Sequence, residues 1–114
     1  MNPLSSGLSE ATIDKIRGVF AARPRVEKAI LYGSRARGDF KNGSDIDLTL
    51  FGDGLGHEDL LDLTDQLDEL LLPYTIDLSI FDRLNHANLQ EHITRLGVVF
   101  YERTAARAAN GGMK

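Results

Sequence analysis

The 114-residue sequence contains no cysteine and no tryptophan, and it has only three prolines. Without cysteine the chain has no disulfide framework, no thiolate nucleophile and no cysteine-based zinc site. No apolar run approaches the roughly 18 residues that a membrane span needs, and the first ten residues lack the pattern of a secretory signal. These absences favour a soluble protein of the cytoplasm, and we expect no membrane partner.

Positive charge is missing from the middle of the chain, where no lysine or arginine occurs from Asn42 to Asp82. The net charge is −4 and the pI is near 5.3, which excludes a protein that coats nucleic acid by general basicity, so we expect no direct nucleic-acid binding. One row of acids is predicted to form the outer, solvated side of a helix, and it consists of Asp59, Asp62, Asp65, Asp68 and Glu69.

Apolar periodicity predicts one domain that mixes helices and strands, over residues 1–103, with a loose leader at 1–7 and a flexible tail at 104–114. Helices are expected from Ser9, as the N-cap, to about residue 22, and over residues 57–72 and 84–95. Strands are expected over residues 26–32, 45–51 and 75–81. Residues 98–101 form a short apolar element whose secondary structure the pattern does not decide. The leucines predicted to face the core from the middle helix are Leu60, Leu63, Leu67, Leu70 and Leu71.

Three aspartates occupy strand positions, where aspartate is disfavoured. Asp45 and Asp47 are two residues apart, so their carboxylates leave the same face of the sheet. Asp77 joins them on that face if its strand is a neighbour. Such a group can hold two Mg²⁺ ions, because magnesium takes oxygen ligands and the ions relieve the repulsion between carboxylates. The alternative is that Asp45 caps a turn while Asp47 and Asp77 point into solvent.

The segment Tyr32-Gly33-Ser34-Arg35-Ala36-Arg37-Gly38 follows the first strand and is predicted to open a short helix. Gly33 permits close approach of the backbone to a ligand, and free amides at a helix start attract phosphate. Ser34 adds a hydroxyl donor, and Arg35 and Arg37 offer guanidinium groups to phosphate oxygens. Solubility explains an exposed arginine pair almost as well. A phosphate loop followed by a carboxylate pair is the requirement of nucleotidyl transfer.

Gly33-Ser34, ten further residues and Asp45-Ile46-Asp47 resemble the GSx10DxD signature of the nucleotidyltransferase superfamily that includes DNA polymerase beta. The run LYGSRARGDFKNGSDIDLTLF resembles the minimal nucleotidyltransferases, the MNT family. The resemblance implies an α/β (α+β) fold with a short mixed β-sheet backed by helices. It also implies that Gly33 and Ser34 bind the β- and γ-phosphates, with Arg35 and Arg37 as further phosphate partners. Asp45 and Asp47 would bind both metals, and Asp77 would be the third carboxylate.

The same resemblance implies ATP as the donor and a basic, helical HEPN toxin as the partner, because MNT proteins pair with such toxins as antitoxins. They transfer AMP from ATP to a tyrosine hydroxyl. Two alternatives stay open, namely an antitoxin that masks its toxin by stoichiometric contact and a transferase for a small hydroxylated acceptor. His57, His86 and His92 lack the spacing of metal ligands, and surface or core positions are predicted for them.

Overall fold

The computed structural model describes residues 6–41 and 43–103. In chain order its elements are α1 (Glu10–Ala21), β1 (Lys28–Tyr32), α2 (Ser34–Arg37), β2 (Ile46–Phe51), α3 (His57–Asp68), β3 (Ile76–Ile80), the 3₁₀ turn η2 (Phe81–Arg83), α4 (Ala87–Leu96) and β4 (Val98–Glu102). None of the helices in the described part of the chain is long and apolar enough to cross a membrane.

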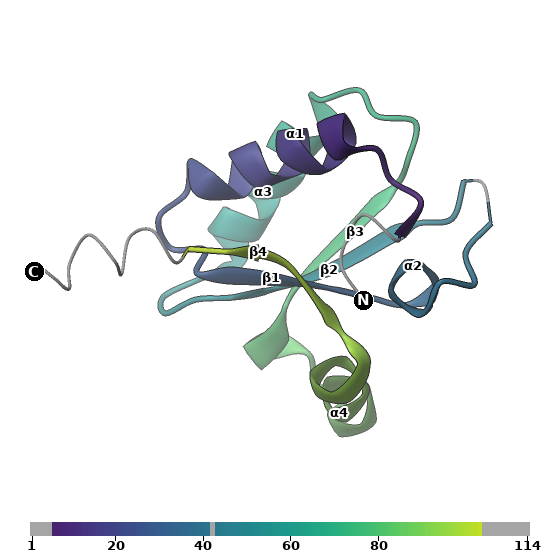
Figure 1. Ribbon diagram of the computed structural model, residues 1–114. Coiled ribbons are helices and arrows are strands. Elements are labelled where there is room, and N and C mark those ends of the chain that lie inside the picture. Colours follow the sequence, from purple (N-terminus) through teal and green to yellow (C-terminus); the bar gives the residue numbers. More distant parts are fainter. Residues whose placement is uncertain (1–5, 42, 104–114) are drawn as a thin grey trace, which may run out of the picture.

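The strands form one mixed sheet in the order β3-β2-β1-β4. β1 runs antiparallel to both β2 and β4, whereas β3 runs parallel to β2. The parallel pair follows from its connection, because α3 carries the chain back to the end of the sheet where β2 began. This arrangement confirms the predicted short mixed sheet backed by helices (Figure 1).

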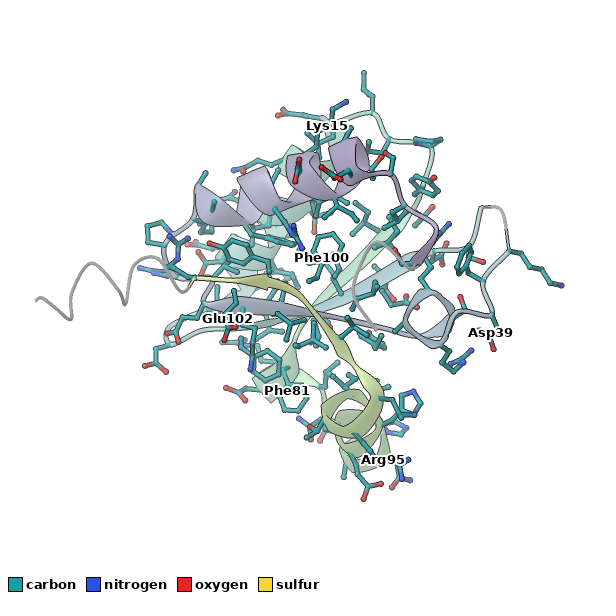
Figure 2. The ribbon with its side chains drawn as sticks, in the orientation of Figure 1. Lys15, Asp39, Phe81, Arg95, Phe100 and Glu102 are labelled. Atoms are coloured by element: carbon teal, nitrogen blue, oxygen red, sulfur yellow. The ribbon has the colours of Figure 1, made fainter. Side chains whose placement is uncertain are left out.

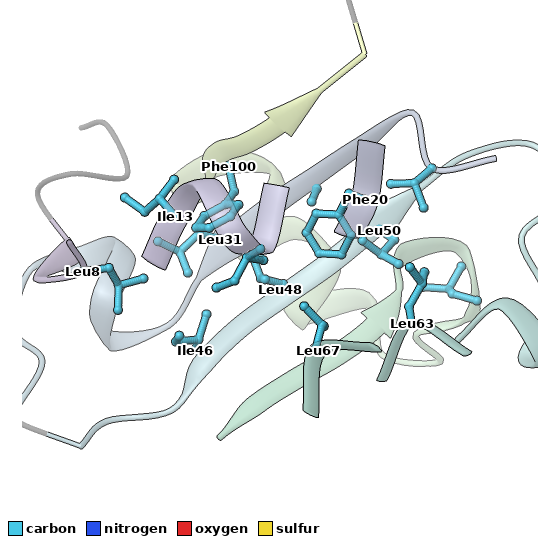
Figure 3. Close-up of a cluster of buried hydrophobic side chains, with 14 of the residues drawn as sticks. Leu8, Ile13, Phe20, Leu31, Ile46, Leu48, Leu50, Leu63, Leu67 and Phe100 are labelled. Carbon is cyan, nitrogen blue, oxygen red and sulfur yellow. The ribbon is translucent and has the colours of Figure 1, made fainter. Parts of the chain in front are cut away.

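α1 and α3 cover one face of the sheet, and α4 lies on the other (Figure 1). The strict alternation of β2 sends Ile46, Leu48 and Leu50 toward α1 and α3, and all three are fully buried there (Figure 3). Each such side chain contributes roughly 1.5–3 kcal/mol of hydrophobic stabilisation. Phe100 lies on this covered side and Phe81 on the opposite side (Figure 2). On the side of the sheet where α4 lies, Thr49 is buried, Asp47 is half-buried and Asp77 is exposed.

Two helix boundaries differ from those predicted. α3 ends at Asp68 rather than at residue 72, and Leu71 is 87% exposed with a φ of 56°. The core position predicted for Leu71 is wrong, because the chain has left the helix there. α4 begins at Ala87 rather than at residue 84, because η2 and an extended segment come first and the His86 ring caps the helix by accepting from Leu89 N at 3.0 Å.

The ends of the chain fall largely outside the described residues. The expected flexible tail at 104–114 lies beyond them, and so does the leader up to residue 5. Ser6 does not fit a loose leader, since it is fully buried and its carbonyl accepts a hydrogen bond from Arg35. Other boundaries agree closely with expectation: Ser9 caps α1 by accepting from Thr12 N at 3.1 Å, and residues 98–102 form the edge strand β4.

Candidate active site

Three segments meet at one end of the sheet, on the face that α1 and α3 leave open. In the strand register Asp47 pairs with Tyr32 of β1 on one side and with Asp77 of β3 on the other. Paired positions on adjacent strands point to the same face, so these three side chains form a row across the sheet. The predicted neighbourhood of the two aspartate-bearing strands is confirmed. Asp45 lies just before β2 and is exposed.

Asp47 lies between Tyr32 and Asp77 in this row, and the neighbouring charges act on its carboxyl group. Partial burial raises the pKa of the Asp47 carboxyl, and the negative charges of Asp77 and then Asp45 raise it further. The Arg37 guanidinium opposes this rise. The charges of Asp77 and Asp45 therefore each repel the Asp47 carboxylate through space, and a divalent cation would relieve that repulsion.

The carboxylate oxygens are the donor type that Mg²⁺ prefers, so the residues fit this ion chemically. Within residues 6–41 and 43–103, no three His, Asp or Glu side chains are gathered tightly enough to hold a metal together. The shared site of Asp45, Asp47 and Asp77 thus stays a prediction, supported by the paired positions of Asp47 and Asp77 and by the charges of Asp77 and Asp45 that act on Asp47.

Gly33 connects β1 to α2 with a φ of 80°, in the region that favours glycine. A Cβ on Gly33 would run into the Oδ2 atom of Asp47. Glycine is required here for two reasons, the backbone conformation and the close approach of the Asp47 carboxylate. The sequence predicted a close approach to phosphate, and that role stays a prediction.

The predicted short helix after Gly33 is confirmed as α2, which begins at Ser34, ends at Arg37 and is followed by Gly38 in the left-handed conformation. The Ser34 carbonyl accepts from Gly38 N at 2.9 Å, which fixes this single turn. The Gly33 carbonyl accepts from Ala36 N and Arg37 N, both at 3.1 Å, which leaves the Ser34 and Arg35 amides as the helix-start donors of this turn. The Ser34 side chain is half-buried at this place.

The two arginines of α2 have different surroundings. Arg37 is exposed, its charge acts on Asp47, and its Nε lies 3.2 Å from an Asp39 carboxylate oxygen. Arg35 is only 2% exposed, and it donates from Nε to Ser44 O and from Nη1 to Ser6 O. The predicted role of Arg35 as a phosphate partner does not agree with this placement, because its guanidinium is buried and bound to backbone carbonyls. Arg37 keeps that predicted role.

The half-buried Tyr32 lies beside Asp47 in this row, a position for which the sequence analysis predicted no functional role. Burial raises the pKa of the Tyr32 hydroxyl, and the charges of Asp47 and Asp77 add to the rise, while an interaction with Ser79 works against it. Farther along the same face, Ser79 donates to the fully buried Thr49 at 2.9 Å. The alternation of polar residues on β2 and β3 was the sequence signal for this polar row.

The acidic row of α3 is only partly the solvated face that was predicted. Asp59 is buried and accepts from Gly56 N at 2.9 Å and from Arg23 Nη1 at 2.7 Å. Arg25 lies 3.4 Å from the same carboxylate, and Arg23 also contacts Asp62 at 3.0 Å. Arg23 and Arg25 precede β1 in the sequence but contact α3 in the fold. They bring positive charge to a helix whose own sequence, like the rest of residues 42–82, contains none.

Comparison with known proteins places this geometry in a family. The sequence model of the family described as "Polymerase beta, Nucleotidyltransferase" matches residues 14–106, which include every segment of the site. The search of curated proteins found no match.

Several solved structures share the fold. A toxin–antitoxin complex with AMP-PNP aligns with a TM-score of 0.64 and 22% identity, covering 87% of this chain and 77% of that chain. The MntA–HepT toxin–antitoxin aligns with a TM-score of 0.62 and 18% identity over 86% of this chain and 76% of the other. A tri-AMPylated Shewanella oneidensis HEPN toxin in complex with MNT antitoxin aligns with a TM-score of 0.63 and 17% identity, covering 90% of this chain and 79% of that chain.

The family match covers most of the chain, and the mixed sheet has the fold of these structures. The chain therefore belongs to the Polymerase beta nucleotidyltransferase family.

Proposed function

We propose that this protein is a Mg²⁺-dependent adenylyltransferase of the minimal nucleotidyltransferase branch and the antitoxin of a HEPN toxin. In this proposal it acts in the cytoplasm, transferring AMP from ATP to a tyrosine hydroxyl of the toxin. The observation that carries the proposal is the alignment of Asp47 with Asp77 beside the tight turn at Gly33.

Each site residue has a role in the proposed reaction. Asp45 and Asp47 would hold two Mg²⁺ ions with Asp77 as the third carboxylate, and these ions would neutralise phosphate charge. The turn at Gly33 and Ser34 would bind the β- and γ-phosphates through backbone amides and the serine hydroxyl. The exposed Arg37 would add a charged hydrogen bond to the triphosphate.

The chemistry is a displacement at the α-phosphorus of ATP. The acceptor hydroxyl oxygen forms a bond to that phosphorus, and the bond between the α-phosphorus and the bridging oxygen breaks, so pyrophosphate leaves. Asp77 helps to take up the hydroxyl proton, which passes on to solvent. The products are an AMP ester of the acceptor, pyrophosphate and one proton.

Two observations support a HEPN toxin as the acceptor. Solved proteins of the same fold are antitoxins in such complexes, one of them with a toxin that carries AMP groups. The site row is also negatively charged, since Asp45 and Asp77 both act on Asp47. A basic partner complements such a surface and associates faster with it.

Intact mass measurement of a co-encoded helical protein tests this function. The purified protein is incubated with ATP, Mg²⁺ and that neighbour, and the neighbour is expected to gain one or more AMP groups. Tight binding with no mass gain would favour masking instead of transfer. No binding and no gain, together with AMP transfer to a hydroxylated small molecule, would favour the third alternative.

A further inference from the structure

Arg35 is the one arginine among the fully buried large side chains of the described residues. A buried cation is costly unless its donors are satisfied, so its retention requires a structural or functional reason. The site described above leaves Arg35 without a part in the chemistry. Its contacts, however, reach every segment that carries a proposed site residue.

The guanidinium makes two hydrogen bonds to backbone carbonyls. Nε donates to Ser44 O at 3.1 Å, and Ser44 is the residue directly before Asp45. Nη1 donates to Ser6 O at 2.8 Å. Arg35 itself follows Ser34 in α2, so its side chain ties the phosphate turn directly to the base of the segment that presents Asp45.

Two aromatic rings contact the same guanidinium. Its Cζ atom lies 5.0 Å from the centroid of the Phe40 ring and 4.9 Å from that of the Tyr74 ring. Tyr74 stands three residues before Asp77, and the next residue, Thr75, accepts from Ile46 N at 2.9 Å where β2 and β3 begin. One planar cation thus touches the segments leading to both Asp45 and Asp77.

We propose that Arg35 is a positioning residue, which holds the segments carrying Asp45 and Asp77 against the Gly33-Ser34 turn in the arrangement that binds metal. This inference rests on the proposed function, because the metal ions and their ligands are the ones proposed there. Lysine cannot replace arginine here, because only a planar guanidinium can bind two carbonyls and contact two rings at once.

The direct test is amide hydrogen exchange in the full-length protein without nucleotide or metal. Lys41 N donates to Ser44 Oγ at 2.8 Å and Ser44 N to Lys41 O at 3.0 Å, so both amides report on the segment before Asp45. In Arg35→Lys and in Arg35→Met we expect their exchange to accelerate at least about fivefold, because the anchoring hydrogen bond to Ser44 is lost.

Arg103 supplies the matched control. Its guanidinium also binds several backbone carbonyls, including those of Phe20 and Arg23, but it does so at the opposite end of the sheet. Arg103→Met is expected to accelerate exchange at Val26, which donates to Arg23 O at 3.0 Å, and to leave Ser44 unchanged. Acceleration at Ser44 in the Arg103 variant as well would indicate general loosening and would overturn the proposal.

The second measurement is the response to Mg²⁺. Loss of a group that orients metal ligands weakens metal binding by about 10- to 100-fold. We expect Arg35→Lys to raise the half-saturating Mg²⁺ concentration for transfer by that factor, with a smaller change in the KM for ATP, while Arg103→Met leaves both unchanged.

Unchanged exchange at Lys41 and Ser44 in both Arg35 variants would overturn the proposal, even if the wild-type protein transferred no AMP. Faster exchange in a protein inactive from the start would support positioning and count against the proposed function alone.

Discussion

Gly33 and Asp47 lie so close that a side chain on the first would occupy the place of the carboxylate of the second. Gly33 directly follows β1, and Asp47 pairs across the sheet with the preceding residue, Tyr32. The backbone turn and the central carboxylate are therefore a single packed unit. Changes at either residue should affect the other.

Gly33→Ala tests this contact. The added Cβ must displace the Asp47 carboxylate, and the positive φ strains any side chain, so we expect transfer to fall at least about a hundredfold and stability to fall by roughly 1–3 kcal/mol. Transfer rates and thermal unfolding measure the two effects.

Gly54→Ala is the control, since Gly54 also has a positive φ, of 78°, but its Cβ would meet nothing within 4 Å. This variant should lose stability and keep its transfer rate. Equal losses of activity in both glycine variants would show that strain, and not the contact with Asp47, explains the effect.

Asp77→Asn separates stability from activity. Removing this charge relieves repulsion on Asp47, whose pKa is raised by burial and by Asp77, so the melting temperature at neutral pH should rise slightly. Transfer should fall roughly a thousandfold or more, because a metal ligand supplies several kcal/mol of charge stabilisation. Near-normal turnover in this variant would remove Asp77 from the site.

Asp59 should make stability depend on acid pH. The hydrogen bond from Gly56 N, together with the Arg23 contact, lowers the pKa of the Asp59 carboxyl below its ordinary value. The carboxylate therefore stabilises the fold fully above about pH 4, and this contribution disappears as the pH falls through the lowered pKa. The difference in melting temperature between wild type and Asp59→Asn should be several degrees at pH 7 and should shrink below about pH 4.

Asp62→Asn serves as the comparison for that pH series. Asp62 also contacts Arg23, but its side chain is 58% exposed, and such surface pairs contribute little. Its melting temperature should follow that of the wild type at every pH. A larger loss in Asp62→Asn than in Asp59→Asn would contradict this account of the α3 terminus.

Arg37→Ala should raise the KM for ATP roughly tenfold, the loss of about one charged hydrogen bond. The unfolding temperature should stay nearly constant, because Arg37 is exposed and forms an ion pair with Asp39, which is also exposed. An unchanged KM with a large loss of stability would reverse the roles that we assign to the two arginines of α2.

Much of this fold is predictable from short-range patterns. The alternation of apolar and polar residues in β2 and β3 predicts which of their side chains face the core, and the glycines on either side of α2 predict its tight turn. Both signals are local, because backbone geometry depends on neighbouring residues. The partnership of Asp47 and Asp77 was predicted only under the condition that their strands are adjacent, which the parallel register then satisfied.

Side-chain environments were harder to predict. Arg35 and Arg37 are two residues apart and chemically identical, yet one is buried between two rings and the other is exposed. The difference depends on Phe40, Tyr74 and Ser6, which come from three separate segments. Asp59 was assigned to solvent for the same reason, since its arginine partners lie more than thirty residues earlier in the chain.

The central claim is adenylyl transfer that depends on Asp47, and isotope labelling tests it most directly. The protein, its co-encoded helical partner and Mg²⁺ are incubated with ATP labelled in either the α- or the γ-phosphate, using wild type and Asp47→Asn. We predict α-label on the partner with the wild-type protein only, and release of the γ-label as pyrophosphate. Transfer of γ-label, or equal α-label with the Asp47→Asn variant, would contradict it.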